Sequence, residues 1–252
     1  MSKIAWVTGA SSGIGRATAV ELAKLNHNLI LSARRSEKLD SLRSELISEY
    51  GIKVLTLTLD VRDREAVLAT CSSLDADWRD IDVLVNNAGL ASGMDLFQDA
   101  SLDDWDQMID TNVKGLLYVS KGVVPYMIAR NKGHIINIDS TAGKEVYPKG
   151  NVYCATKYAV DAISKGMRLD LLEHSIKVTN LCPGMVETEF SKVRFHGDES
   201  KADKVYQGFK PLVAEDIANC IGFAVSLPEH VCINDLVITC TAQANSMFTK
   251  RD

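Results

Sequence analysis

The stretch Thr8-Gly9-Ala10-Ser11-Ser12-Gly13-Ile14-Gly15 decides the fold of this chain. It follows the short apolar run Ile4–Val7 and leads into residues 16–22, whose composition strongly favours a helix. Glycine lets a backbone come close to a ligand, and the amides at a helix N-terminus stabilise an anion. The TGxxxGxG spacing differs from the GxGxxG fingerprint, and a plain tight turn is the alternative interpretation. We predict that a nucleotide phosphate binds at Gly9, Ser11, Ser12, Gly13, Ile14 and Gly15.

Length and composition are those of an ordinary globular protein. The chain has 252 residues, and because α/β sheets of this size often fold as one unit, we expect a single domain over residues 1–252. Hydrophobic residues make up 46%, and no apolar run approaches the roughly 18 residues that span a bilayer. The net charge of −5 provides no basic field to attract nucleic acid. We therefore expect neither a membrane nor a nucleic acid as partner.

The cysteines and histidines lack the spacing of metal ligands. The six cysteines form no CxxC pair, and no secretory segment precedes them, which favours reduced thiols in a cytoplasmic protein. The five histidines are interpreted as surface or capping residues. The sequence therefore predicts no metal.

Short apolar runs alternate with longer amphipathic segments along the whole chain, a pattern typical of repeated βα units and a parallel sheet. The predicted strands are Ile4–Val7, Asn28–Ala33, Lys53–Thr58, Val83–Val85, His134–Asn137, Lys177–Leu181 and Asp235–Thr239. The predicted helices begin near Gly13, Ser36, Asp63, Asp104, Tyr153 and Ala214. We expect an α/β fold with a doubly wound parallel sheet of about seven strands. The least regular stretch, residues 187–210, is charged and is a candidate lid over a ligand site.

Two arginines follow the second predicted strand, about 20 residues after the Gly-rich turn, where NAD enzymes keep a ribose-binding acid. Here the sequence is Ser32-Ala33-Arg34-Arg35. Guanidinium groups suit a 2′-phosphate, and each charge-assisted contact favours NADP by about 1.5–3 kcal/mol, or about ten- to a hundred-fold in affinity. The alternative is a solvated basic helix start, but a cation at a helix N-terminus opposes the helix dipole. Arg34 and Arg35 therefore predict NADP as the coenzyme.

Polar residues end several of the predicted strands, which places them at the edge where parallel sheets bind ligands. Asp60-Val61 follows the third strand, Asn86-Asn87-Ala88-Gly89 ends the fourth, and Ser140 follows the fifth. Each could alone be a turn residue, but together they indicate a ligand crevice. Asn112 lies in a predicted helix, where asparagine is unfavourable, so we expect its side chain to bind a specific group.

Tyr153 and Lys157 are four residues apart on a predicted helix, so their side chains share one face. A free phenol titrates near about 10, but an ammonium about 5 Å away contributes about 3 kcal/mol at an effective dielectric constant of about 20. That interaction lowers the phenol pKa by roughly 2 units and creates a usable proton shuttle. The alternative is a packed aromatic residue beside a snorkelling lysine. Combined with a nucleotide site, the pair predicts redox chemistry on an alcohol or carbonyl.

The chain resembles the short-chain dehydrogenase/reductase family across its whole length. The matching motifs, in order, are TGASSGIG at 8–15, NNAG at 86–89, Asn112, Ser140, Tyr153-x-x-x-Lys157 and Pro183-Gly184-x-x-x-Thr188. Further stretches are similar to the NADP-dependent serine/3-hydroxy acid dehydrogenase branch, which includes malonic semialdehyde reductases. These stretches are Asp104-Trp105, residues 108–112, 134–138 and 140–143, Val193-Arg194-Phe195 and Gly197-Asp198.

The resemblance implies a Rossmann-type enzyme, usually a homotetramer. Tyr153 is then the acid/base, Lys157 lowers its pKa and binds the nicotinamide ribose, Ser140 orients the substrate oxygen, and Asn112 holds a proton-relay water. Thr188 is implied to hold the carboxamide, with Val186 packed beside it. The remaining coenzyme-binding residues implied are Asp60, Val61, Asn87, Ala88, Gly89, Pro183 and Gly184.

The substrate is a separate question. We expect Arg194, on the candidate lid, to bind a substrate carboxylate, because a planar guanidinium matches the geometry of a carboxylate. We expect Tyr147 and Lys144 to line the same pocket. The alternative is that Arg194 is a surface charge in a polar loop. These expectations favour an NADP(H)-dependent oxidoreductase of a small 3-hydroxy acid such as serine, allo-threonine or 3-hydroxypropionate. Two alternatives stay open: a reductase of another small aldehyde or ketone, such as sulfoacetaldehyde, and an NADP-sensing module without turnover.

Overall fold

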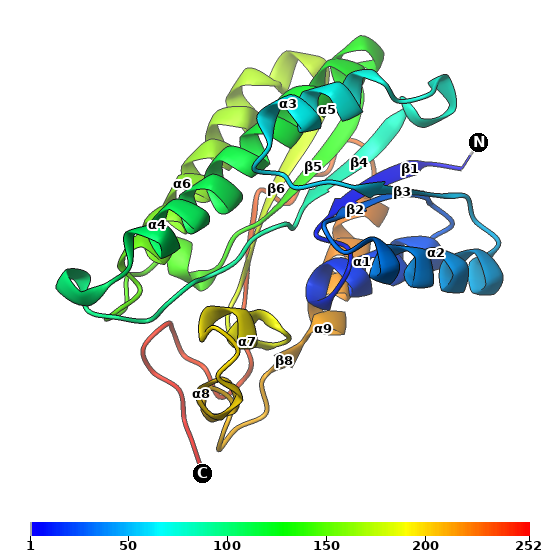
Figure 1. The fold of residues 1–252 in the computed structure, drawn as a ribbon. Helices are drawn as coiled ribbons and strands as arrows, with labels where there is room; N and C mark the ends of the chain where they lie inside the picture. The colour runs from blue at the N-terminus through cyan, green and yellow to red at the C-terminus, as the bar shows by residue number, and fades with distance from the viewer. Residues whose placement is uncertain (1) are drawn as a thin grey trace.

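Seven parallel strands form the central sheet of the computed structural model, which describes residues 2–252 (Figure 1). Their spatial order is β3-β2-β1-β4-β5-β6-β9, so the doubly wound sheet predicted from the sequence is confirmed. The order reverses between β1 and β4, and ligands bind beside such a switch point. The strands are β1 (Ile4–Thr8), β2 (Asn28–Ala33), β3 (Val54–Thr58), β4 (Ile81–Asn86), β5 (Gly133–Ile138), β6 (Ile176–Pro183) and β9 (Asp235–Ile238).

Helices cover both faces of this sheet (Figure 1). One face carries α1 (Gly13–Lys24), α2 (Ser36–Tyr50) and α9 (Ala214–Ser226), and the other carries α3 (Arg64–Ser72), α5 (Leu116–Arg130) and α6 (Asn151–Asp170), with α4 (Leu102–Ile109) beside α6. Successive side chains of a strand point to opposite faces, so Trp6 and Val7 belong to two different apolar clusters. Burial on both faces explains why these strands are nearly continuous apolar runs.

Side chains cap only some of the helix starts: Ser12 before α1 and Ser101 before α4 form no capping hydrogen bond. The Asp63 carboxylate accepts a hydrogen bond from the Ala66 amide at 2.9 Å and caps α3, as predicted. Helices α4 and α6 begin at Leu102 and Asn151, slightly before the predicted starts. Helix α5 was missed because it contains Pro125 and is apolar on most of its circumference, so it lacks a clear amphipathic period.

The stretch 187–210 is more regular than predicted. It contains the short helices α7 (Phe190–Arg194) and α8 (Glu199–Lys204), with Asp198 capping α8 through the Lys201 amide at 3.0 Å. A small parallel pair, β7 (Val186–Glu187) and β8 (Leu212–Val213), borders it. This segment and the C-terminus lie beyond the carboxyl ends of the sheet strands (Figure 1). Within residues 2–252, no helix has both the length and the apolar character needed to cross a membrane.

His134 provides a test of this packing. It lies buried on β5, with Nε2 2.8 Å from Thr179 Oγ1 on β6, and burial lowers its pKa to about 3. Because the pKa is lower in the folded chain than in the unfolded chain, this contribution to stability is present above about pH 6.5 and is lost as the pH falls. Urea unfolding of the native protein between about pH 7 and about pH 5 should therefore include a loss of about 2 kcal/mol that His134→Gln lacks. Equal losses in the two proteins would contradict this assignment.

Candidate active site

A cavity of about 720 Å³ lies at the carboxyl edge of the sheet. Its walls come from the Gly-rich turn, from the ends of strands β2 to β6, and from the α7–α8 segment. Every predicted site residue lines this cavity except Gly15, Asn112 and Lys144. Residues far apart in the sequence therefore meet at the switch point of the sheet.

The Gly-rich turn is tied to the end of β4. Gly9 has a φ of +66° and Gly13 a φ of +51°, which glycine adopts without strain. The Asn87 Nδ2 group donates to the carbonyls of Thr8 at 2.9 Å and Gly9 at 3.2 Å. A Cβ atom on Gly15 would collide with this Asn87 amide, so Gly15 supports the turn from behind instead of lining the cavity. The turn is thus held open for a ligand at the N-terminus of α1.

Arg35 faces the Gly-rich turn. Its guanidinium donates to Ser11 Oγ at 3.1 Å and to Ser12 Oγ at 2.8 Å. The same group forms an ion pair of 3.0 Å with the carboxylate of Glu189, which also binds Lys38 Nζ at 3.1 Å. Glu189 was not predicted as a site residue, because no local sequence pattern indicates that residues 187–210 contact the end of β2. The carboxylate of Glu189 therefore already binds Arg35, which was predicted to bind the 2′-phosphate.

Arg34 lies on the same rim of the cavity, near Asp60 at the end of β3. The Arg62 guanidinium, 2.6 Å from the Asp60 carboxylate, holds the pKa of that carboxyl below its usual value, and Arg34 adds to the effect at longer range. Asp60 is therefore a carboxylate on the cavity rim.

Tyr153 and Lys157 lie buried on one face of α6, with side chains directed to the ends of β5 and β6. The Lys157 Nζ atom donates to the Ile138 carbonyl at 2.8 Å and lies 5.9 Å from the centre of the Tyr153 ring. Burial raises the pKa of Tyr153, whereas the Arg194 guanidinium and a hydrogen bond with Ser140 lower it. The sequence predicted a pKa lowered by Lys157, whereas burial raises the pKa of Tyr153 in the structure, and the cation that opposes this rise is Arg194, 5.4 Å from the ring centre.

Ser140 and Asn112 approach Tyr153 from two other elements. The Ser140 hydroxyl donates to the Pro183 carbonyl at 3.3 Å and accepts from the Ala142 amide at 3.1 Å. Asn112 is buried in a π-helical turn, Asp110–Gly115, where its amide forms two hydrogen bonds with the Leu90 backbone, of 2.8 and 2.9 Å. The Asn112 Nδ2 group also donates to Thr156 Oγ1 on α6 at 3.1 Å, so the expected specific partners of Asn112 are the loop after β4 and α6.

Arg194 reaches into the cavity from α7. Its Nη2 atom donates to the Tyr147 hydroxyl at 2.6 Å, and the Gly93 amide donates to the Arg194 carbonyl at 2.9 Å. Its guanidinium contacts the faces of Tyr147 and Tyr153, and within residues 2–252 it forms no ion pair with a carboxylate. The interpretation of Arg194 as a surface charge is therefore wrong.

The prediction that Lys144 lines the pocket is also wrong. Its ammonium turns away from the cavity and binds the carboxylates of Asp161 and Asp235, each at 2.6 Å. Two buried or half-buried carboxylates attract the side chain more strongly than the apolar pocket does.

The chain is similar to a known protein family over most of its length. The model of the family described as short chain dehydrogenase matches residues 3–199. The chain belongs to the short-chain dehydrogenase family. The NADP-dependent 3-hydroxy acid dehydrogenase YdfG of Salmonella typhi is 49% identical over 232 residues, 92% of each chain. The NADP-dependent 3-hydroxy acid dehydrogenase of Schizosaccharomyces pombe is 45% identical over 248 residues, 97% of this chain and 96% of the relative.

A solved structure of another short-chain dehydrogenase has nearly the same fold. The closed form of serine dehydrogenase complexed with NADP+ superposes with a TM-score of 0.91 at 44% identity, covering 99% of each chain. At this coverage, the similarity includes the sheet, both helical layers and residues 187–210.

Several residues that line the cavity were not predicted from the sequence. Phe190 packs edge-on against Tyr153, with ring centres 5.8 Å apart. The others come from the loop after β4, from residues 185–206 and from the C-terminal segment. No motif or hydrophobic periodicity in the sequence marks them as site residues. They include Met94, Met185, Tyr206, Gln243, Ser246 and Arg251.

Proposed function

We propose that this short-chain dehydrogenase is an NADP(H)-dependent oxidoreductase that interconverts a small 3-hydroxy acid with its semialdehyde or keto acid. One observation carries the proposal: Tyr153, Lys157 and Ser140 line the same cavity as a phosphate-binding turn at one end and Arg194 at the other. Coenzyme, proton donor and substrate anion therefore have adjoining places. The names of the two similar dehydrogenases support the same substrate class.

The coenzyme site is assigned to the Gly-rich turn and the rim of the crevice. Backbone amides at the start of α1 would bind the pyrophosphate, and Arg34 and Arg35 the 2′-phosphate. The coenzyme supplies or accepts the hydride. The surrounding positions are assigned to Asp60, Val61, Asn87, Ala88, Gly89, Pro183, Gly184, Val186 and Thr188, with Thr188 at the carboxamide.

Proton transfer is assigned to Tyr153. Because burial raises its pKa, the phenol is protonated at neutral pH, which is the state needed to donate a proton to a carbonyl undergoing reduction. Ser140 can donate a hydrogen bond to the same oxygen as charge develops there. Lys157 holds the nicotinamide ribose, and Asn112 is proposed to hold a relay water.

The anionic end of the substrate is assigned to Arg194. The guanidinium is fixed by Tyr147 and stands 5.4 Å from the centre of the Tyr153 ring, so a clamped carboxylate would leave only a short carbon chain before the proton donor. That span favours a small hydroxy acid. A sulfonate such as sulfoacetaldehyde would fit the same clamp, and the substrate panel below distinguishes the two.

The larger organisation belongs to the same proposal. Residues 1–252 form one catalytic domain, and residues 187–210 act as its lid. Exposed apolar residues on α4, α5, α6 and α9 support a homotetramer, among them Leu102, Leu117, Leu169 and Phe223. All six cysteines are free thiols, which supports a cytoplasmic protein.

The Tyr153→Phe variant tests the chemistry. It should bind NADPH normally by fluorescence but lower kcat by about 10²–10⁴-fold, because the proton donor is removed while the cavity keeps its shape. The panel is NADPH oxidation with malonic semialdehyde, sulfoacetaldehyde, methylglyoxal and a neutral ketone, repeated with NADH. Turnover of the variant at the native rate would refute the assignment. NADPH binding without turnover of any carbonyl by the native protein would favour the sensing module.

The Arg194→Ala variant tests the substrate class. We expect KM for the anionic aldehydes to rise by about ten- to a hundred-fold while KM for a neutral ketone stays constant, since only the former lose a charge-assisted contact. Lys192→Ala is the matched control, because Lys192 lies on the same helix but is exposed and pairs with Glu199. An equal rise in KM for the anionic aldehydes and the neutral ketone would refute the proposal that Arg194 binds the substrate anion.

The Arg35→Ala variant tests the coenzyme preference. It should raise KM for NADPH by about ten- to a hundred-fold and leave KM for NADH unchanged, because NADH lacks the 2′-phosphate. Arg16→Ala serves as control, since the Arg16 guanidinium pairs with Glu45 outside the cavity. A similar rise for both coenzymes would contradict a 2′-phosphate site at Arg35.

A further inference from the structure

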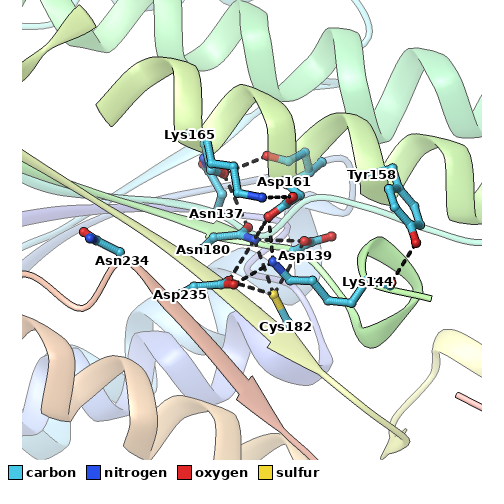
Figure 2. A network of polar contacts seen from close by, with 12 residues as sticks. Asn137, Asp139, Lys144, Tyr158, Asp161, Lys165, Asn180, Cys182, Asn234 and Asp235 are labelled. Atoms are coloured by element: carbon cyan, nitrogen blue, oxygen red, sulfur yellow. Dashed lines mark hydrogen bonds and ion pairs between the residues drawn. The ribbon is translucent and has the colours of Figure 1, made fainter. Parts of the chain in front are cut away.

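Asp139 lines the active-site cavity and belongs to a polar cluster whose side chains are drawn in Figure 2. Asp139, Asn180 and Cys182 are buried, whereas Lys165 and Asp235 are exposed. The cluster joins the end of β5, helix α6, strand β6, edge strand β9 and the turn after Ser140. We call it the Asp139 cluster, and its members are Asp139, Lys144, Asp161, Lys165, Asn180, Cys182 and Asp235.

The charges of this cluster do not pair off within it. Asp161 forms ion pairs of 2.6 Å with both Lys144 and Lys165, and Lys144 also binds Asp235 at 2.6 Å. Asp139 is the carboxylate left over: it forms no ion pair with any residue between 2 and 252. A buried carboxylate without a counter-ion is strongly disfavoured.

Asp139 is also incompletely hydrogen-bonded. Its side chain is only 3% exposed, and Oδ2 accepts from Asn180 Nδ2 at 2.9 Å and from Cys182 Sγ at 3.5 Å. The second oxygen, Oδ1, is buried and has no hydrogen-bond partner among the described residues. Gly143 packs against it so closely that a Cβ atom at that position would collide with both carboxylate oxygens. The carboxylate is therefore held in place and cannot turn toward solvent.

The unpaired cation nearest to Asp139 is Lys157 of the active site. Lys157 Nζ donates to the Ile138 carbonyl at 2.8 Å, and that carbonyl belongs to the peptide unit that joins Ile138 to Asp139. Standard peptide geometry then places the Asp139 Cα atom within about 6 Å of the ammonium. Lys157 is 6% exposed, and its ammonium has no carboxylate in contact within residues 2–252.

We propose that Asp139 is the internal counter-ion of Lys157, a positioning residue that keeps the ammonium charged beside Tyr153. Three carboxylates and three lysines then balance: Asp161 and Asp235 neutralise Lys144 and Lys165, and Asp139 neutralises Lys157. The proposal rests on the proton transfer assigned to Tyr153 and Lys157, but not on which substrate is turned over.

The groups that face Asp139 act in consistent directions. Burial lowers the pKa of Lys157, and Asp139 opposes that shift. Burial raises the pKa of Asp139, and Lys157 is the leading group that opposes it, followed by Asn180 and Cys182. The Asp139 charge also raises the pKa of Tyr153 at longer range.

The Cys182 thiol, between Asp139 and Asp235, has a strongly raised pKa because it is buried, so it stays neutral and adds no charge. Removing the charge of Asp139 should therefore lower the pKa of Lys157 and of Tyr153 together. For a separation of roughly 6–8 Å between the ammonium and the carboxylate and an effective dielectric constant of about 20, the shift for Lys157 is about 1.5–2 pH units.

The test is the pH profile of kcat/KM for Asp139→Asn and Asp139→Ser, in the oxidation direction with NADP+. The substrate is the alcohol of whichever carbonyl the native protein reduces fastest in the panel above. We expect the pH at which activity falls because Lys157 loses its proton to be lower by about 1.5–2 pH units in both variants, and the pKa of Tyr153 to move in the same direction by less. Asp235→Asn is the matched control, because it removes a carboxylate from the same cluster that does not face Lys157.

Thermal unfolding and NADPH fluorescence establish that each variant is folded and binds coenzyme. A purely structural role would lower the amplitude of the profile without moving its limbs, and that result would overturn the proposal. So would an equal shift in Asp235→Asn. Absence of turnover in the native protein with every substrate would instead count against the proposed function, which keeps the two failures separate.

Discussion

A buried ammonium is the constraint on which the rest of this active site depends. Lys157, in the middle of α6, is held by a single backbone carbonyl, that of Ile138 at the end of β5, two residues before Ser140. Burial of a charge is costly, so the surrounding elements must be arranged to keep it. The position of β5 against α6, and the carboxylate that follows Ile138, serve this one requirement.

Two cations of different origin lie beside the Tyr153 ring. Lys157 comes from the rigid helix that carries Tyr153, whereas Arg194 comes from a short helix in the segment between β7 and β8. Because the guanidinium lies 5.4 Å from the Tyr153 ring centre, the position of that segment changes the electrostatics of the proton donor as well as access to the cavity. The substrate contact proposed for Arg194 and the acid strength of Tyr153 would therefore be coupled through one side chain.

Much of this arrangement could be predicted from the sequence, because alternating βα units and the Gly-rich turn require a parallel sheet and fix where each strand ends. That rule places Asp60, Asn87 and Ser140 on one rim. Contacts between distant segments could not be predicted, since no local pattern signals them. Lys144 turned toward Asp161 and Asp235, and Glu189 met Arg35 across more than half of the chain.

The pairing of Glu189 with Arg35 and Lys38 has a consequence for ligand affinity. Any phosphate that binds these cations must first displace a carboxylate supplied by the protein itself. The residues are half exposed, so this competitor is worth only about 0–1 kcal/mol. Selectivity for a phosphorylated ligand at this rim is thus a difference between two anions rather than the full strength of one contact. Glu189 and such an anion would therefore compete for the same two cations.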